Sequence, residues 1–288
     1  MYPLLISAED LRHLSTSDQP PLVFDCSFEL NDANAGASQY RQKRIPGAIH
    51  AHLDQHLSDK RHPSGAQAGR HPLPSRGQFC VWLREQGLAQ DQQVVVYDRQ
   101  GANYCGRLWW MIKWCGHDAV AVLDGGLQAW EAAGFELESG PDTTARQPAT
   151  HPFKEQTSLV RTVDSTEIAA NMGSPDLTIL DARATPRFRG EVEPLDPEAG
   201  HIPGALNRPF SLNLDANGRF KSPGQLKAEF EQLLAGRDPR GVVHHCGSGV
   251  SALPNLLGMA VAGLGLSALY PGSWSAWSNT PGTPRAKS

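Results

Sequence analysis

The sequence has no long hydrophobic run and no strong excess of one charge. No apolar stretch approaches the roughly 20 residues that a membrane-spanning helix needs. The opening residues 1–6 (MYPLLI) lack the basic start and the long apolar core of a signal peptide. A formal net charge of −4, with 19% charged residues, gives no reason to expect nucleic acid or a membrane as a partner. We therefore expect a cytoplasmic protein that acts on neither.

Cysteine is also scarce, odd in number and irregularly spaced, which indicates free thiols in a reducing compartment. The sequence contains no C-x-x-C pair, so neither a zinc site nor a thioredoxin-type site is expected. The four histidines within 50–62 lack the cysteine or carboxylate spacing of a closed metal site. We expect no metal and no organic cofactor. A redox role stays open for Cys26, Cys80, Cys105 and Cys115. For Cys105 and Cys115, packing in the protein core is the better explanation.

The chain of 288 residues is long for one domain, and its second half repeats the first. Each half contains, in the same order, a strand that ends in or near an acid, an Ile-Pro-Gly-Ala turn, a second apolar strand and a glycine-bearing turn that leads to a tryptophan. The matched pairs are 22–25 with 177–183, 45–48 with 202–205, 94–98 with 242–246, and 125–130 with 272–277.

The polar, proline-bearing stretch 139–158 separates the two repeats, as a linker would. We therefore expect one domain at 1–138 and a second at 159–288. Alternating strands and helices predict an α/β fold, in which each domain is a mainly parallel sheet with helices on both faces. Ligands of such sheets bind beyond the carboxyl ends of the strands. The second repeat has Cys246 at such an end and the first has Asp98, so we expect a single active site, at Cys246.

The stretch 241–252 (GVVHHCGSGVSA) carries the clearest chemical signal. It indicates a buried strand ending at Cys246, a Gly-Ser-Gly turn and the start of an apolar helix. The N–H groups of such a turn and the helix dipole favour the nucleophilic thiolate. The alternative, a cysteine buried for packing, leaves the Gly-x-Gly flank without a purpose. Strand alternation puts His244 and His245 on opposite faces, one of them near the site. Pro254 indicates a helix that starts late or has a distorted first turn.

These features together resemble the two-domain rhodanese family, which contains the thiosulfate and the 3-mercaptopyruvate sulfurtransferases. The resemblance covers nearly the whole chain. It rests on both Ile-Pro-Gly-Ala turns and on four further motifs in order, LDGGLQAW at 123–130, DAR at 181–183, GHIPGA at 200–205 and CGSGVS at 246–251. It implies two tandem rhodanese-like domains, of which only the second carries the cysteine nucleophile.

The loop after the cysteine suggests the sulfur donor by the same resemblance. Family members that prefer thiosulfate carry basic side chains there, which suit a dianion, whereas this loop is small and neutral. It resembles the loop of the 3-mercaptopyruvate enzymes, whose serine is associated with an aspartate and a histidine from the first domain. The resemblance thus implies a proton relay of Asp54, His71 and Ser248 across the domain cleft. The alternative for His71 is a loop histidine without a role.

The family also binds its substrate anion through arginine, and Arg187 matches the main position for this. A guanidinium there can hold a carboxylate or a sulfonate with two hydrogen bonds. The 3-mercaptopyruvate enzymes commonly have a second arginine some nine residues further on, where this chain has Asp196. The second arginine is missing from that place, so thiosulfate or another sulfane compound stays open as the alternative sulfur donor. The substrate site is expected to be completed by Gly247, Gly249, Val250 and Ser251.

The expected mechanism is a double displacement through a Cys246 persulfide. The donor releases pyruvate or sulfite, and a small thiol, cyanide or a thioredoxin-like protein accepts the sulfur. Asp181 and Arg183 are expected to tie the strand end to the loop rather than to touch substrate. A phosphatase of this fold would need an arginine six residues after the cysteine, where the chain has Ala252. A persulfide carrier for one protein partner stays open as the non-enzymatic alternative.

Overall fold

The structure is a computed structural model that describes residues 1–142 and 146–288, and this part divides into two compact units. Residues 143–145, within the predicted linker 139–158, lie outside the described residues. Unit 1 contains Met1–Ser58, Pro74–Leu159 and Ala216–Arg219, and unit 2 contains Asp59–Leu73, Val160–Asp215 and Phe220–Ser288. A segment from the first half of the sequence, Asp59–Leu73, therefore folds with unit 2.

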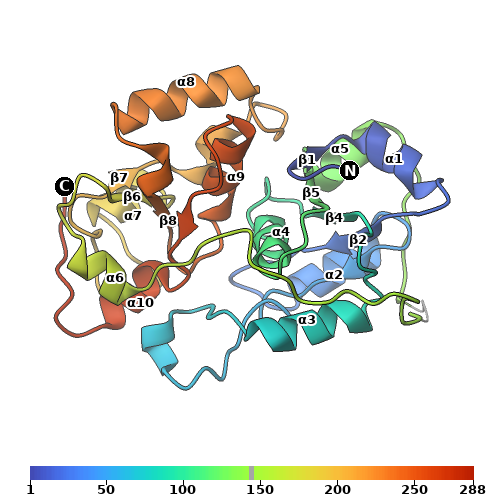
Figure 1. The fold of residues 1–288 in the computed structure, drawn as a ribbon, viewed down its shortest axis with the longest axis horizontal. Coiled ribbons are helices and arrows are strands. Elements are labelled where there is room, and N and C mark those ends of the chain that lie inside the picture. The colour runs from blue at the N-terminus through green and yellow to red at the C-terminus, as the bar shows by residue number, and fades with distance from the viewer. Residues whose placement is uncertain (143–145) are drawn as a thin grey trace. The chain divides into compact units, whose positions relative to one another are not determined.

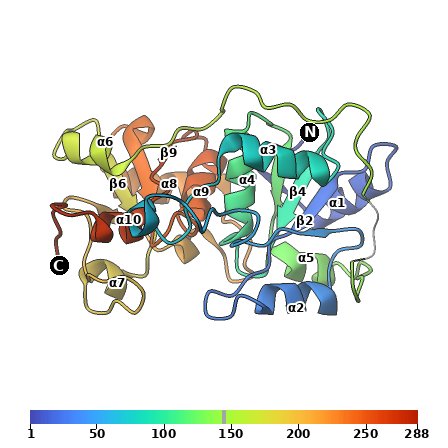
Figure 2. The same ribbon diagram turned by 90° about the horizontal axis from the view of Figure 1, so that it is seen from below.

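Unit 1 is built on a parallel five-stranded sheet in the order β1-β5-β4-β2-β3. Its central strands are apolar along their length because helices cover both faces. Figure 2 shows α3 and α4 on one side of the strands and α2 and α5 on the other. The elements are β1 (Leu5–Ile6), α1 (Ala8–Ser15), β2 (Leu22–Asp25), α2 (Ala35–Gln42), β3 (Ile49–His50), α3 (Arg76–Glu85), β4 (Val94–Tyr97), α4 (Cys105–Trp114), β5 (Val120–Leu123) and α5 (Gly126–Ala132).

Unit 2 repeats this plan with a parallel four-stranded sheet in the order β7-β6-β8-β9. In Figure 1, α8 and α9 lie on one side of its strands and α6 and α10 on the other. The α/β prediction, with a parallel sheet covered on both faces in each repeat, is therefore confirmed. The elements are η1 (Gly65–Ala68), α6 (Ser165–Ala170), β6 (Thr178–Asp181), α7 (Thr185–Arg189), β7 (Leu206–Asn207), η2 (Phe210–Asn213), α8 (Pro223–Leu234), η3 (Pro239–Gly241), β8 (Val242–His245), α9 (Leu253–Val261), β9 (Ala268–Leu269) and α10 (Ser273–Asn279).

The two Ile-Pro-Gly-Ala turns have the same backbone geometry. The N–H of Ala48 donates to the carbonyl of Ile45, and the N–H of Ala205 donates to that of Ile202, each at 3.0 Å. The glycine of each turn has a positive φ, 73° in the first and 80° in the second, as the third position of a type II turn requires. The repeat seen in the sequence is therefore a repeat of local structure.

The core of unit 2 brings the repeated tryptophans under the sheet that carries Cys246. Trp274 and Trp277 of α10 are fully buried and pack with Val243 of β8 and Ile179 of β6. Trp130 of α5 occupies the matching core in unit 1. Among the described residues, no helix is both long enough and apolar enough to cross a membrane.

Candidate active site

Cys246 directly follows β8, the strand that lies between β6 and β9. The N–H of Val250 donates a hydrogen bond to the Cys246 Sγ at 3.3 Å. The Cys246 carbonyl accepts the N–H of Trp274 at 2.9 Å, and its own N–H donates to the Oγ of Ser273 at 3.1 Å. The side chain is 1% exposed. The sulfur is thus fixed at a strand end by the loop after it and by the start of α10.

The loop after the cysteine needs its second glycine for two reasons. Gly249 has a φ of +73°, which disfavours a side chain. A Cβ atom there would also lie 2.3 Å from the carbonyl oxygen of Pro271. The helix α9 begins only at Leu253 and holds Pro254 in its first turn, where a missing N–H costs nothing. Of the two outcomes expected for this proline, a late start is therefore the correct one.

Ser273 holds a backbone conformation that the first repeat gives to a glycine. Its φ is +54°, and the matched residue of unit 1, Gly126, has a φ of +60°. The strained serine accepts the N–H of Cys246, as described, and donates its hydroxyl to the carbonyl of Tyr270 at 3.0 Å. Backbone strain of this kind persists where the surrounding structure demands it, often at functional sites. The mismatch of glycine and serine in the aligned repeats was the signal for this residue in the sequence.

The structure brings together two members of the expected proton relay. His71 Nδ1 lies 2.8 Å from the Oγ of Ser248, and both side chains are buried. His71 belongs to the Asp59–Leu73 segment, so both residues lie in unit 2. Asp54 lies in unit 1, where its backbone N–H donates to His52 Nδ1 at 3.1 Å. A part for Asp54 in the relay stays a prediction.

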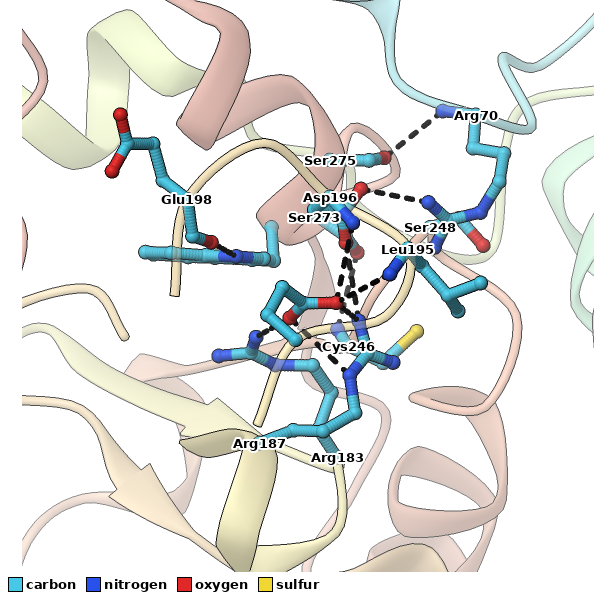
Figure 3. Close-up of polar contacts among 12 residues, drawn as sticks. Arg70, Arg183, Arg187, Leu195, Asp196, Glu198, Cys246, Ser248, Ser273 and Ser275 are labelled. Carbon is cyan, nitrogen blue, oxygen red and sulfur yellow. Dashed lines mark hydrogen bonds and ion pairs between the residues drawn. The ribbon is translucent and has the colours of Figure 1, made fainter. Parts of the chain in front are cut away.

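Arg187 lies beside the site on α7 and is bound by two buried acids. Its Nη2 contacts Glu193 Oε1 at 2.6 Å and Asp196 Oδ2 at 3.1 Å. Asp196 occupies the place where a second arginine was sought, and its other oxygen binds Arg70 Nη1 at 2.7 Å. Figure 3 shows Asp196 with Arg70 and Arg187 close to Cys246. Sequence reasoning missed Arg70 as a site residue, although it directly precedes His71; an acid in place of an expected arginine was the available signal.

Arg183 and Asp181 form a fully buried ion pair at the end of β6. Arg183 Nη2 lies 2.7 Å from Asp181 Oδ2 and donates to the carbonyl of Gly200 at 2.7 Å. Its Nη1 lies 3.3 Å from Glu193. The pair therefore anchors the segment that carries Glu193 and Asp196.

Of the two strand histidines, one was expected to lie near the site, and the structure buries both fully. His244 Nε2 contacts the Oγ of Ser267 at 2.8 Å, and burial lowers its pKa to about 3. His245 contacts the carbonyl of Cys246 through Nδ1 at 3.2 Å. Burial lowers the pKa of His245 although Asp181 lies 3.6 Å away. Strand alternation predicted opposite faces correctly, but helices cover both faces of this sheet.

The first repeat fills its matching loop with a carboxylate. Asp98 stands after β4 as Cys246 stands after β8, and it is fully buried. Its two oxygens accept the backbone N–H groups of four loop residues at 2.8–3.1 Å. These donors belong to Gln100, Ala102, Tyr104 and Cys105. Unit 1 thus has a cradle of N–H groups at the matching place, with an aspartate side chain where unit 2 has the cysteine.

The comparisons with known proteins agree with this repeat. The pattern of the rhodanese-like domain matches residues 7–133 and 164–280. A probable 3-mercaptopyruvate sulfurtransferase of Pseudomonas aeruginosa is 44% identical over 98% of this chain and 97% of its own length. A putative thiosulfate sulfurtransferase of Mycobacterium tuberculosis is 38% identical over 98% of this chain and 96% of its own. The structure of the 3-mercaptopyruvate sulfurtransferase from Leishmania major matches with a TM-score of 0.81 at 33% identity, over 94% of this chain and 73% of that one.

Proposed function

The chain belongs to the rhodanese family of sulfurtransferases, and we propose that it transfers a sulfane sulfur from 3-mercaptopyruvate, through a persulfide on Cys246, to a thiol or cyanide acceptor. The observation that carries the choice of donor is the 2.8 Å contact of His71 Nδ1 with the Ser248 hydroxyl, two residues from the sulfur. The Ser248 hydroxyl can supply a proton beside Cys246, and 3-mercaptopyruvate needs such a proton whereas thiosulfate does not.

In the first half-reaction, the Cys246 thiolate attacks the sulfur of 3-mercaptopyruvate. An S–S bond forms, the C–S bond breaks, and its electron pair remains on the carbon as the enolate of pyruvate. One proton then converts the enolate into pyruvate, and the enzyme is left as the Cys246 persulfide. Sulfite, the leaving group of thiosulfate, departs as a stable anion and requires no such proton.

The buried serine and histidine suit this proton delivery. The Ser248 hydroxyl can donate to the enolate carbon while His71 replaces its proton, as positioned general acids do. The burial of both groups limits competing proton exchange with water. Asp54 stays a proposed member of this relay by resemblance.

The loop supports the persulfide stage of the cycle. The N–H of Val250 already donates to the Cys246 Sγ at 3.3 Å, and further N–H groups of residues 247–251 can face a terminal sulfur. Arg187 supplies positive charge for the donor carboxylate. In the second half-reaction, an acceptor thiolate or cyanide attacks the terminal sulfur and regenerates the Cys246 thiolate. A thioredoxin-like protein is a suitable acceptor because its active-site thiol is of this kind.

The test is steady-state turnover of 3-mercaptopyruvate against thiosulfate, with cyanide as the acceptor, for wild type and Cys246→Ser. We expect a large preference for 3-mercaptopyruvate and no activity in the variant, which cannot form a persulfide. A preference for thiosulfate would make this a thiosulfate enzyme. Slow turnover of both donors, together with a Cys246 persulfide in the mass spectrum and fast transfer to one protein, would make it a carrier.

A further inference from the structure

We propose that Arg70 is the second arginine of the donor site, and that it binds the carboxylate of 3-mercaptopyruvate together with Arg187 over Gly247. This role rests on the proposed function, because it assigns a residue to the same donor. The site thereby has, from a different segment of the chain, the second guanidinium that the chain lacks at position 196.

The two guanidinium groups converge on one point beside the nucleophile. A Cβ atom at Gly247 would lie 3.0 Å from Arg70 Nη2 and 3.4 Å from Arg187 Nη1. Gly247 is the residue next to Cys246, and it has no side chain to occupy this position. A carboxylate placed there can accept one hydrogen bond from each arginine, which is the geometry that favours arginine over lysine at such sites.

The donors that face Gly247 are not used by other groups. Within the described residues, the side-chain hydrogen bond of Arg70 goes from Nη1 to Asp196, and its Nε is buried without a hydrogen-bond partner. The hydrogen bonds of Arg187 use Nε and Nη2, which contact Glu193 and Asp196. Arg70 Nη2 and Arg187 Nη1 are thus left to bind a substrate anion.

Two acids, Glu193 and Asp196, hold Arg70 and Arg187 in position. The side chain of Asp196 is 2% exposed and binds one guanidinium with each of its oxygens. Glu193 binds Arg187 from the same side, so two acids formally balance the charges of Arg70 and Arg187. A carboxylate adds one negative charge to this neutral cluster, whereas thiosulfate adds two. Because the charge of a partly buried cluster is costly to change, the arrangement favours the monoanion.

The same loop contacts place Arg70 and His71. The N–H of Arg70 donates to the Oγ of Ser275 in α10 at 2.9 Å, a contact that Figure 3 shows. The preceding Gly69 has a φ of +91°, and a Cβ atom on it would lie 2.7 Å from the carbonyl oxygen of Gly272. This close packing fixes the end of the Asp59–Leu73 segment on α10. The segment Asp59–Leu73 therefore supplies both Arg70, for the donor carboxylate, and His71, for protonation of the enolate carbon.

The experiment compares Arg70→Gln with wild type on 3-mercaptopyruvate and on mercaptoacetone, which keeps the thiol and the ketone but has no carboxylate. Loss of one charge-assisted hydrogen bond should lower kcat/KM for 3-mercaptopyruvate roughly 10- to 100-fold, mainly through KM. Turnover of mercaptoacetone should change by less than about twofold. The matched control is Arg189→Gln, since Arg189 is exposed on α7 and pairs only with exposed Glu191 among the described residues.

A charge reversal keeps the test independent of folding defects. Arg70→Asp should raise KM for 3-mercaptopyruvate more than Arg70→Gln does, because it places a negative charge beside the donor carboxylate, while turnover of mercaptoacetone should again change by less than about twofold. Equal losses with both donors, or no rise in KM for 3-mercaptopyruvate, would overturn the role of Arg70.

Pyruvate affinity, measured by calorimetry, separates this proposal from the proposed function. If wild type binds pyruvate and Arg70→Gln binds it at least about tenfold more weakly, the carboxylate site stands even where 3-mercaptopyruvate is not turned over. If wild type turns over 3-mercaptopyruvate while both proteins bind pyruvate equally, the donor assignment stands and Arg70 has no part in it.

Discussion

His71 and Ser248 are 177 positions apart in the sequence and meet at 2.8 Å, two residues along the chain from Cys246. The contact joins a loop of the first repeat to the cysteine loop of the second within one compact unit. It gives the serine hydroxyl a buried proton partner, which a serine in a loop of small residues otherwise lacks. The contact between His71 and Ser248 can therefore be tested separately from the sulfur-transfer step.

We expect His71→Gln and Ser248→Ala each to lower kcat for 3-mercaptopyruvate by about 10²- to 10⁴-fold, the usual contribution of a general acid. Turnover of thiosulfate should fall far less, because sulfite leaves without a proton. Steady-state kinetics with both donors measure this. His62→Gln is the matched control, since His62 lies in the same segment and its Nδ1 accepts the N–H of Ser64. Equal losses of kcat with the two donors would show that His71 and Ser248 do not form a proton relay.

The two glycines of the cysteine loop should respond differently to alanine. Gly249→Ala should lower the free energy of unfolding by more than about 1 kcal/mol, because the positive φ and the carbonyl of Pro271 both oppose a Cβ atom. Gly247→Ala has no such backbone conflict, but its methyl group enters the space between Arg70 and Arg187. It should raise KM for 3-mercaptopyruvate with little change in stability. Urea denaturation and steady-state kinetics on both variants check this, and similar stability losses would contradict it.

Asp98→Ala should destabilise unit 1, because four backbone N–H groups, three of them in buried hydrogen bonds, lose their acceptor. Each unsatisfied buried donor costs about 1–3 kcal/mol, with water entry reducing the sum, so we expect a loss of at least about 3 kcal/mol. The measurement is the urea midpoint. Asp91→Ala, at an exposed position of the same unit, is the control. A midpoint shift no larger than the control's would show that the loop does not depend on this carboxylate.

Buried His244 should make the protein sensitive to acid. Its pKa is about 3 in the folded state because burial disfavours the charged ring, while an unfolded histidine has a pKa of about 6.5. Between these values the unfolded chain binds more protons, so the free energy of unfolding falls as pH falls, by up to about 1.4 kcal/mol per pH unit for this group. His244→Gln should reduce that slope between about pH 6 and pH 4, in urea titrations at several pH values. His13→Gln, on the exposed side of α1, should keep the wild-type slope.

Much of the fold was predictable because its signals are local. The apolar strands Val94–Tyr97 and Val242–His245, and the glycines of the Ile-Pro-Gly-Ala turns, specify their own geometry. Ser75 and Ser222 also cap α3 and α8 as capping boxes, which are local signals of a helix start. The burial of both His244 and His245 was missed, because periodicity gives the face of a strand but not what covers that face.

The two parallel sheets, the repeat, and a cysteine at a strand end followed by a glycine turn were predictable, since each follows from residues close together in the chain. The contact of Arg70 with Asp196, across 126 positions, and that of His71 with Ser248 arise from the packing of distant segments and were not predictable in this way. Both contacts depend on where the segment Asp59–Leu73 packs. That choice is made by the fit of its glycine and backbone against α10, and no local pattern in the segment encodes it.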